Sequence, residues 1–159
     1  MKFSKVATAV LITAMAGGVI GPVAAHGDSE EKEKRFFESQ YRHDVMEHFS
    51  YSMKKLIPIL FKNAGHKDHL PEIANIMAST AKMSKSSFKK DTRGMEGRTE
   101  SKDNIWENWS DFSARMDKLE ADTAAFSEAT KSGDMAVIVP AFKKVGSNCK
   151  SCHDEYKKG

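Results

Sequence analysis

The chain has 159 residues, a length typical of one compact domain, and a formal net charge of +3. Lys2 and Lys5 belong to an apolar N-terminal segment, and without them 23 basic side chains are nearly balanced by 22 acidic ones. This balance argues against a nucleic-acid partner, which would require a clear basic excess.

Residues 1–25 have the pattern of a secretory signal peptide. Two lysines precede a long apolar run that ends at Pro22, and small residues follow up to Ala25. A single membrane anchor is the alternative, but the run is short for a span and contains glycine. We therefore predict cleavage before His26, export to the periplasm, a mature domain of residues 26–159, and no membrane attachment after cleavage.

The mature segment has a helical pattern, because no stretch combines alternation of apolar and polar residues with β-branched enrichment. A first helix is predicted from about Asp28 or Ser29 to Asn63, with a stop at Gly65. Pro58 lies inside it and predicts a kink. The inward stripe is predicted from spacings of three and four: Phe37, Tyr41, Val45, Phe49, Met53, Leu56 and Leu60.

A second helix is predicted from about Leu70 to Phe88, with these residues inward: Ile73, Ile76, Met77, Thr80 and Met83. The polar stretch from Lys89 to Ser101 is long for a bundle connection and predicts a crossover. A third helix is predicted from about Asp103 to a stop at Gly133. Its inward residues alternate steps of four and three: Ile105, Trp109, Phe112, Met116, Leu119, Thr123 and Phe126.

Asp134 is placed to cap a fourth helix. The inward residues of this helix again form one stripe: Met135, Ile138, Phe142, Val145, Cys149, Cys152 and Tyr156. Four helices with one apolar stripe each predict an all-α fold, an antiparallel four-helix bundle.

The segment Cys149-Lys150-Ser151-Cys152-His153 carries the strongest chemical signal, the C-x-x-C-H spacing of c-type haem attachment. Residues three apart share a helix face, so both thiols meet one edge of the porphyrin and can add across its two vinyl groups. The adjacent imidazole then lies under the iron as the proximal ligand. We predict one covalently attached haem c, held inside the bundle near the C-terminal helix.

Other interpretations of the cysteines are open. A thioredoxin-like dithiol uses C-x-x-C, but on a strand–helix unit that this pattern does not predict. A zinc site combining His153 with a distant His66 or His69 lacks zinc-finger spacing. A disulfide is disfavoured, because helical i, i+3 cysteines are poorly placed for one and the loop that it closes is small.

Only six residues follow His153 and none is methionine, so any sixth iron ligand lies upstream. A C-x-x-C-H motif on the last helix of a four-helix bundle resembles the class II cytochromes c, the cytochrome c′ family. The resemblance covers the whole mature chain. Besides the motif, it is carried by Tyr41-Arg42, Met46, Ile105-Trp106, Phe112, Gly133-Asp134, Ala141-Phe142, Val145-Gly146, Asp154 and Tyr156.

The resemblance implies roles for matching positions. Arg42 corresponds to the family arginine that pairs with a haem propionate. Met46, four residues later on the same helix face, corresponds to the position that faces the vacant side of the iron. Lys157 stands where many members have an arginine beside the proximal histidine. Family members often pair through their first two helices, which implies a homodimer.

Met46 separates two functions. As a sixth ligand it would give a low-spin haem for electron transfer with a redox partner protein, the function that we predict first. As an apolar wall it would leave a five-coordinate, high-spin haem that binds nitric oxide or carbon monoxide, the alternative. His43, His48 and Met53 are lesser candidates on the same helix.

The end of the fourth helix is basic, which suits either the helix dipole or an acidic redox partner: Lys143, Lys144, Lys150, Lys157 and Lys158. The sequence contains no recognisable nucleophile–base constellation or phosphate-binding loop. We therefore predict a haem protein that is not an enzyme.

Overall fold

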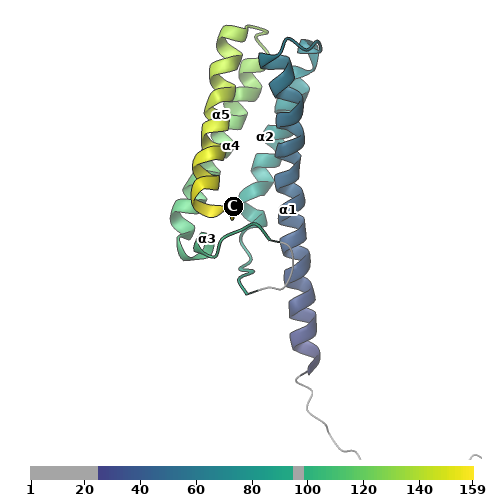
Figure 1. Ribbon diagram of the computed structural model, residues 1–159, viewed down its shortest axis with the longest axis vertical. Helices are drawn as coiled ribbons and strands as arrows, with labels where there is room; N and C mark the ends of the chain where they lie inside the picture. The colour runs from purple at the N-terminus through teal and green to yellow at the C-terminus, as the bar shows by residue number, and fades with distance from the viewer. Residues whose placement is uncertain (1–24, 95–98) are drawn as a thin grey trace, which may run out of the picture.

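The computed structural model describes residues 25–94 and 99–159, with side chains from Glu30 onward (Figure 1). The predicted signal peptide, residues 1–25, lies outside the described residues apart from Ala25. The helices are α1 (Ala25–Phe61), the 3-10 turn η1 (Lys67–His69), α2 (Leu70–Ser87), α3 (Asn104–Glu107), α4 (Trp109–Thr130) and α5 (Met135–Tyr156). The described residues form no strand beyond an isolated bridge between Ser101 and Lys157. The predicted all-α fold is confirmed.

The four long helices α1, α2, α4 and α5 run up and down in turn as the predicted antiparallel bundle (Figure 1). α2 packs between α1 and α4, and α4 packs against α5. α1 continues well beyond the other helices at its N-terminal end. In the described part of the chain, no helix combines the length and the hydrophobicity of a membrane span.

Two apolar clusters fill the bundle. The larger draws on all four long helices and includes the fully buried Leu56, Met77 and Phe126. Met46 and Leu119 pack against both clusters, so they lie where the two meet. The smaller cluster joins the α2–α3 connection to α4 and α5: Phe88, Ile105, Phe112, Met116 and Tyr156.

The inward face of α1 differs from the predicted stripe in its N-terminal half. Phe37 and Tyr41 are 58% and 51% exposed, whereas Ser39 and Arg42 are buried. Four residues turn about 400° around a helix, so each repeated step of four drifts about 40° off a face. Counting back from Phe49 in alternate steps of three and four gives the half-buried Met46 and then the buried Arg42 and Ser39.

The turn after α1 is not built on the predicted Gly65. The helix ends at Phe61, with Pro58 inside it. The residues that take left-handed conformations are Asn63 and His66, with φ of 51° and 68°. Both asparagine and histidine are enriched in that conformation, so they can replace glycine in such a turn.

α2 has the predicted bounds to within one residue. Ile73, Met77 and Thr80 are buried as predicted, but Ile76 and Met83 are 52% and 39% exposed. Because α2 packs on both α1 and α4, its inner surface is built mostly from small side chains that allow close approach. The small buried residues are Ala74, Ala78, Ala81, Ser84 and Ser87.

The predicted third helix is interrupted at Asn108, whose φ and ψ of −117° and 42° separate α3 from α4. The connection from α2 is long, as predicted, but α2 packs directly against α4, the main part of the predicted third helix, so the connection is not a crossover. It also contacts the end of α5, where Lys102 N donates to Tyr156 O at 3.0 Å. Of the predicted inward residues, Trp109 and Leu119 are half-buried and the others are buried: Ile105, Phe112, Met116, Thr123 and Phe126.

α5 begins where the sequence predicts. Gly133 has a left-handed φ of 67°. The carboxylate of Asp134 accepts a hydrogen bond from Ala136 N at 2.8 Å and caps the helix. The predicted stripe faces inward, with Met135 and the two cysteines half-buried and the others buried: Ile138, Phe142, Val145 and Tyr156.

Candidate functional site

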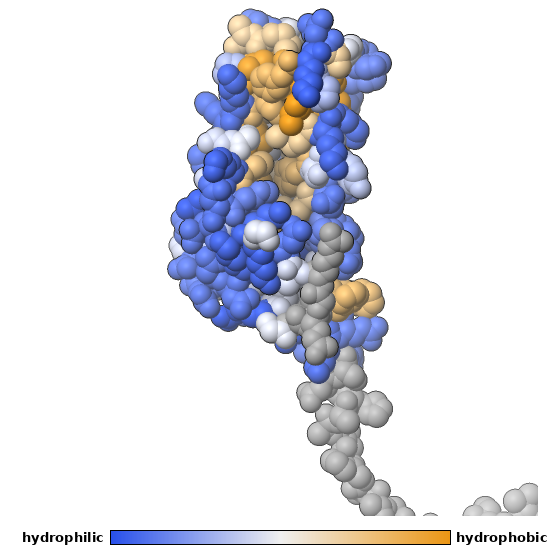
Figure 2. Space-filling view, viewed as in Figure 1, coloured by the Kyte–Doolittle hydropathy of each residue, from blue (hydrophilic) through white to orange (hydrophobic). Residues whose placement is uncertain are grey.

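A pocket of about 390 Å³ lies between α1, α4 and α5. Residues 99–101 of the α2–α3 connection, Phe88 and Ile105 of α3 complete its lining. Figure 2 shows a hollow between α5 and α1 with hydrophobic side chains on its walls. Small-molecule sites commonly have volumes of about 300–1,000 Å³, so the pocket is large enough for a cofactor.

All the predicted site residues line this one pocket. Cys149, Cys152 and His153 contribute from α5, and Arg42 and Met46 contribute from α1. Residues more than 100 positions apart in the sequence therefore lie around a single cavity, as the resemblance implies.

The lesser candidates divide into two groups. His43 and Met53 line the pocket, whereas His48 is exposed and is not part of the lining. Lys157 lines it as well, and its ammonium group pairs with Glu100 at 3.0 Å. His48 is therefore a surface residue and not a ligand candidate.

The α5 wall carries two free, half-buried thiols. Burial raises the pKa of the Cys149 thiol and raises the pKa of Cys152 to about 11. A thioredoxin-like dithiol needs a lowered thiol pKa, so this wall does not suit that chemistry. Burial, aided by the charge of Lys157, lowers the pKa of His153 although part of its side chain stays exposed. This favours the neutral imidazole, the form that binds metals.

On the α1 wall, Arg42 is only 2% exposed. Its guanidinium lies over the rings of Phe88 and Trp106, 5.0 and 5.3 Å from their centroids. Nη2 donates to the hydroxyl of Thr92 at 3.0 Å and more weakly to that of Ser39 at 3.4 Å.

The side-chain hydrogen-bond partners of Arg42 are hydroxyl groups, and its buried Nη1 has no hydrogen-bond acceptor in the described residues. Burial lowers the pKa of Arg42, which reflects the cost of placing a charge there. An arginine held in this way is suited to a carboxylate ligand, since a charge-assisted hydrogen bond would satisfy Nη1. Sequence reasoning missed the residues that hold Arg42, because Thr92 lies 50 positions away.

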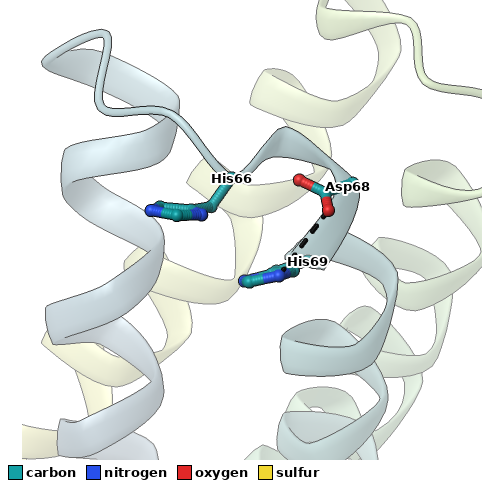
Figure 3. Close-up of side chains that lie close together, drawn as sticks. All are labelled: His66, Asp68 and His69. Atoms are coloured by element: carbon teal, nitrogen blue, oxygen red, sulfur yellow. Dashed lines mark ion pairs between the residues drawn. The ribbon is translucent and has the colours of Figure 1, made fainter.

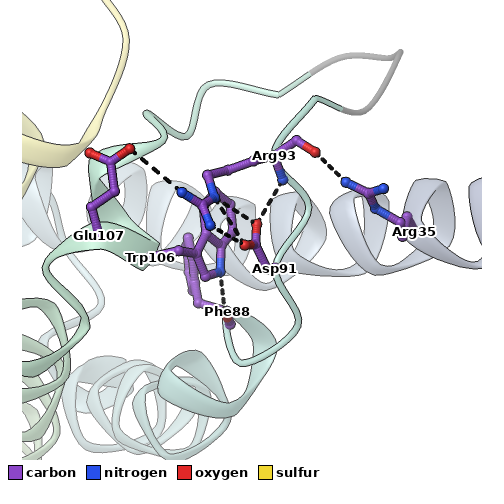
Figure 4. Close-up of polar contacts among 6 residues, drawn as sticks. All are labelled: Arg35, Phe88, Asp91, Arg93, Trp106 and Glu107. Carbon is purple, nitrogen blue, oxygen red and sulfur yellow. Dashed lines mark hydrogen bonds and ion pairs between the residues drawn. The ribbon is translucent and has the colours of Figure 1, made fainter.

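The loop that covers Arg42 is fixed by a polar network (Figure 4). Trp106 Nε1 donates to Phe88 O at 2.9 Å. Arg93 pairs with Asp91 at 2.7 Å and with Glu107 of α3 at 3.5 Å. These contacts tie the start of the α2–α3 connection to α3, so both rings beside Arg42 are held in place.

The α4 wall braces the C-x-x-C-H segment. Asp111 accepts hydrogen bonds from the Tyr156 hydroxyl at 2.6 Å and from Arg115 Nε at 2.7 Å. Arg115 Nη1 also donates to the carbonyl of Ser151, inside the motif, at 3.2 Å. Burial and the bond to Asp111 raise the pKa of Tyr156 to about 12. The i, i+4 spacing of Asp111 and Arg115 was the available sequence signal for this pair.

The histidines of the zinc alternative lie elsewhere. His66 and His69 group with Asp68 in the turn between α1 and α2, and none of the three lines the pocket (Figure 3). Within the described ranges, no cluster of potential metal ligands joins them to His153. The geometry therefore does not support a zinc site shared with the motif.

A family model described as Cytochrome C′ matches residues 38–157. The chain belongs to the cytochrome c′ family. Among its curated relatives, the cytochrome c′ of Rhodospirillum rubrum is 27% identical over 118 residues, which cover 74% of this chain and 80% of that protein.

Solved structures of the family have the same bundle. Cytochrome c′ from Shewanella frigidimarina is 27% identical with a TM-score of 0.73, over 79% of this chain and 97% of that one. A ferrous variant from Alcaligenes xylosoxidans with bound nitric oxide is 21% identical with a TM-score of 0.69, over 77% and 94% of the two chains. At 21% identity, the similarity to the Alcaligenes xylosoxidans structure shows the fold alone.

As a member of this family, the chain binds one c-type haem. The pocket of this chain fits the group in three respects. Its walls are largely apolar, which suits a porphyrin ring. Its α5 wall presents two free thiols one helical turn apart. The buried Nη1 of Arg42 provides a donor for a propionate carboxylate.

Proposed function

We propose that the chain binds nitric oxide or carbon monoxide at a five-coordinate, high-spin haem. In this proposal Cys149 and Cys152 hold the haem through thioether bonds, His153 binds the iron, and Arg42 pairs with a propionate. The bound haem supplies an iron whose sixth position accepts a diatomic ligand. A family structure solved with nitric oxide supports this function over the electron transfer predicted first from the sequence.

The placement of Met46 carries the proposal. Its half-buried side chain packs against both apolar clusters of the bundle. Ligation would exchange these packing contacts for a bond to iron. Phe49 and Met53 line the same pocket from later turns of α1. An apolar wall of this kind leaves room for a small diatomic ligand and disfavours polar or larger ones.

Electron transfer is the second candidate, because Met46 does line the pocket. An electron carrier needs a docking surface, and the basic end of α5 was the predicted one. Two of its lysines are paired within the chain, Lys150 with Asp154 at 2.6 Å and Lys157 with Glu100 at 3.0 Å. These pairs weaken the positive potential that would attract an acidic partner.

Absorption spectra of the purified holoprotein, ferric and ferrous, with and without carbon monoxide, test the proposal. We expect a high-spin spectrum that shifts when carbon monoxide binds. Met46→Leu and the matched control Met53→Leu should keep the high-spin character. A low-spin spectrum with a far-red methionine–iron band, insensitive to carbon monoxide, would contradict the proposal. Loss of that band in Met46→Leu alone would then assign Met46 as the ligand.

Haem staining of a denaturing gel tests the attachment. Thioether-bound haem stays on the chain through denaturation, so the parent protein should stain. Replacing both Cys149 and Cys152 by alanine should abolish the stain. A covalent signal that persists in this double variant would rule out the proposed attachment.

We also propose export to the periplasm and pairing of two copies through α1 and α2. Large apolar side chains exposed on these helices support the pairing: Phe36, Phe37, Tyr41, Tyr51, Ile57, Phe61, Ile76 and Met83. Sedimentation velocity over a range of concentrations tests the pairing, and a monomer throughout would contradict it.

Mass spectrometry of the periplasmic protein tests the export, with an N-terminus at His26 as the expected result.

A further inference from the structure

A compact group of potential metal ligands lies in the turn between α1 and α2 (Figure 3). His66, Asp68 and His69 each offer one ligand atom, and these atoms lie within 4.8 Å of one another. All three residues are exposed. The carboxylate of Asp68 is 3.6 Å from His69 Nε2. Two imidazoles and a carboxylate within four consecutive residues form a ligand set that the haem site does not use.

The backbone brings the two histidines together before any ligand binds. His69 N donates to His66 O at 3.0 Å, which closes a turn of 3-10 type. Side chains at i and i+3 are eclipsed in such a turn. The two imidazole rings are accordingly stacked, with centroids 5.0 Å apart and planes 18° from parallel. His66 enters the turn in a left-handed conformation, with φ 68° and ψ 32°.

We propose that His66, Asp68 and His69 bind a divalent transition-metal ion of the Zn²⁺ class. Imidazole nitrogen and carboxylate oxygen are ligands that Zn²⁺ and its neighbours in the first transition row accept. Three ligands from the chain leave the fourth tetrahedral position to water, as in open zinc sites.

Metal binding requires only a small movement of the three side chains. Zn²⁺ binds such atoms at about 2.0–2.1 Å, which places two tetrahedral ligands about 3.3 Å apart. Rotation of the side chains can close the remaining gap, because all three side chains are exposed and their ligand atoms already lie within 4.8 Å of one another. Because the backbone turn is already closed, less conformational entropy is lost when a metal binds.

This site is independent of the haem. None of its residues lines the pocket, so metal binding and haem chemistry can be measured separately. No other group in the described ranges of the chain brings three such ligands together. A stoichiometry near one ion per chain is therefore expected.

Isothermal titration of Zn²⁺ into untagged holoprotein, freed of metal by prior dialysis against a chelator, tests the proposal. His66→Asn and His69→Gln should each weaken Zn²⁺ binding by at least about tenfold, and Asp68→Asn should weaken it less. Asparagine is chosen at position 66 because it tolerates the left-handed backbone. His48→Gln, on exposed α1 surface, and His26→Gln, next to the predicted cleavage point, are the controls and should bind as the parent does.

The haem absorption spectrum of each variant shows whether its fold is intact. The proposal is overturned if the parent takes up no Zn²⁺ at concentrations below about 1 mM. It is also overturned if the His66→Asn, His69→Gln double variant binds as tightly as the parent, or if only a control variant loses binding. Each of these results leaves the proposed gas binding unaffected.

Discussion

Phe112 and Phe126 provide a matched test of how much ring contacts add to the core. Both lie on α4, and their side chains are 1% and 0% exposed. Phe126 contacts one ring among the described residues, that of Phe142, with centroids 5.4 Å apart. Phe112 contacts three rings, at centroid distances of 4.9, 5.7 and 5.2 Å: Phe88, Trp109 and Tyr156.

The same substitution at both positions separates the ring contacts from burial. Phe→Leu at a buried site also costs free energy through lost burial and repacking, and this cost should be similar in the two variants because both side chains are fully buried. Each aromatic pair adds about 0.5–1.5 kcal/mol beyond burial. Phe112→Leu removes two pairs more than Phe126→Leu does. It should therefore lower the free energy of unfolding by about 1–3 kcal/mol more.

Urea unfolding of the holoproteins, followed by far-ultraviolet circular dichroism, measures this difference. The dependence of free energy on urea should be the same in parent and variants, so that midpoints report stability alone. Phe112 also lines the haem pocket, and lost haem contacts would enlarge the difference in the same direction. Equal losses, or a larger loss in Phe126→Leu, would refute the reasoning.

Two further predictions concern α5 and its contact with α4. Asp134→Ala should lower the free energy of unfolding by about 1 kcal/mol, because it removes the bond to Ala136 N. Asp134→Asn still caps, and an equal loss in that variant would contradict the cap. A hydrogen bond from Lys118 chiefly lowers the pKa of Asp122, and Asn148 of α5 contributes. A lowered carboxyl pKa stabilises the fold above the unfolded value of about 3.9, and the contribution is lost as pH falls through the folded pKa. Asp122→Asn should therefore be less stable than the parent near neutral pH and approach it in acid. A difference in unfolding free energy that does not change with pH would contradict this.

The bounds of the helices could be predicted where the signals are local. Gly133 and Asp134 end one helix and cap the next within two residues, and the structure agrees. The break at Asn108 carries neither glycine nor proline, so periodicity continues through it and predicts a single helix. The residues around Asn108 therefore give no local signal of the break.

The α5 wall of the pocket could also be predicted from local signals, whereas the α1 wall could not. The haem-attachment residues of the α5 wall lie within five consecutive positions, so their spacing alone predicts which side chains face the pocket together. The α1 wall depends on Arg42 and on partners far along the chain. Thr92 of the α2–α3 connection and Trp106 of α3 contact Arg42, and no local pattern in either segment indicates the contact. Only the family resemblance brought Arg42 into the predicted site.

The exposed aromatic residues of α1 and the burial of Arg42 have one cause. Alternate steps of three and four back from Phe49 lead through Met46 to Arg42. The apolar residues of this segment instead follow steps of four, which drift around the helix and carry Tyr41 onto the surface. Hydrophobic periodicity therefore favours the row of apolar residues at steps of four, because arginine counts as a polar residue that faces outward. Arg42 continues the three–four stripe that includes Phe49 and Met46, which accounts for its burial at 2% exposure.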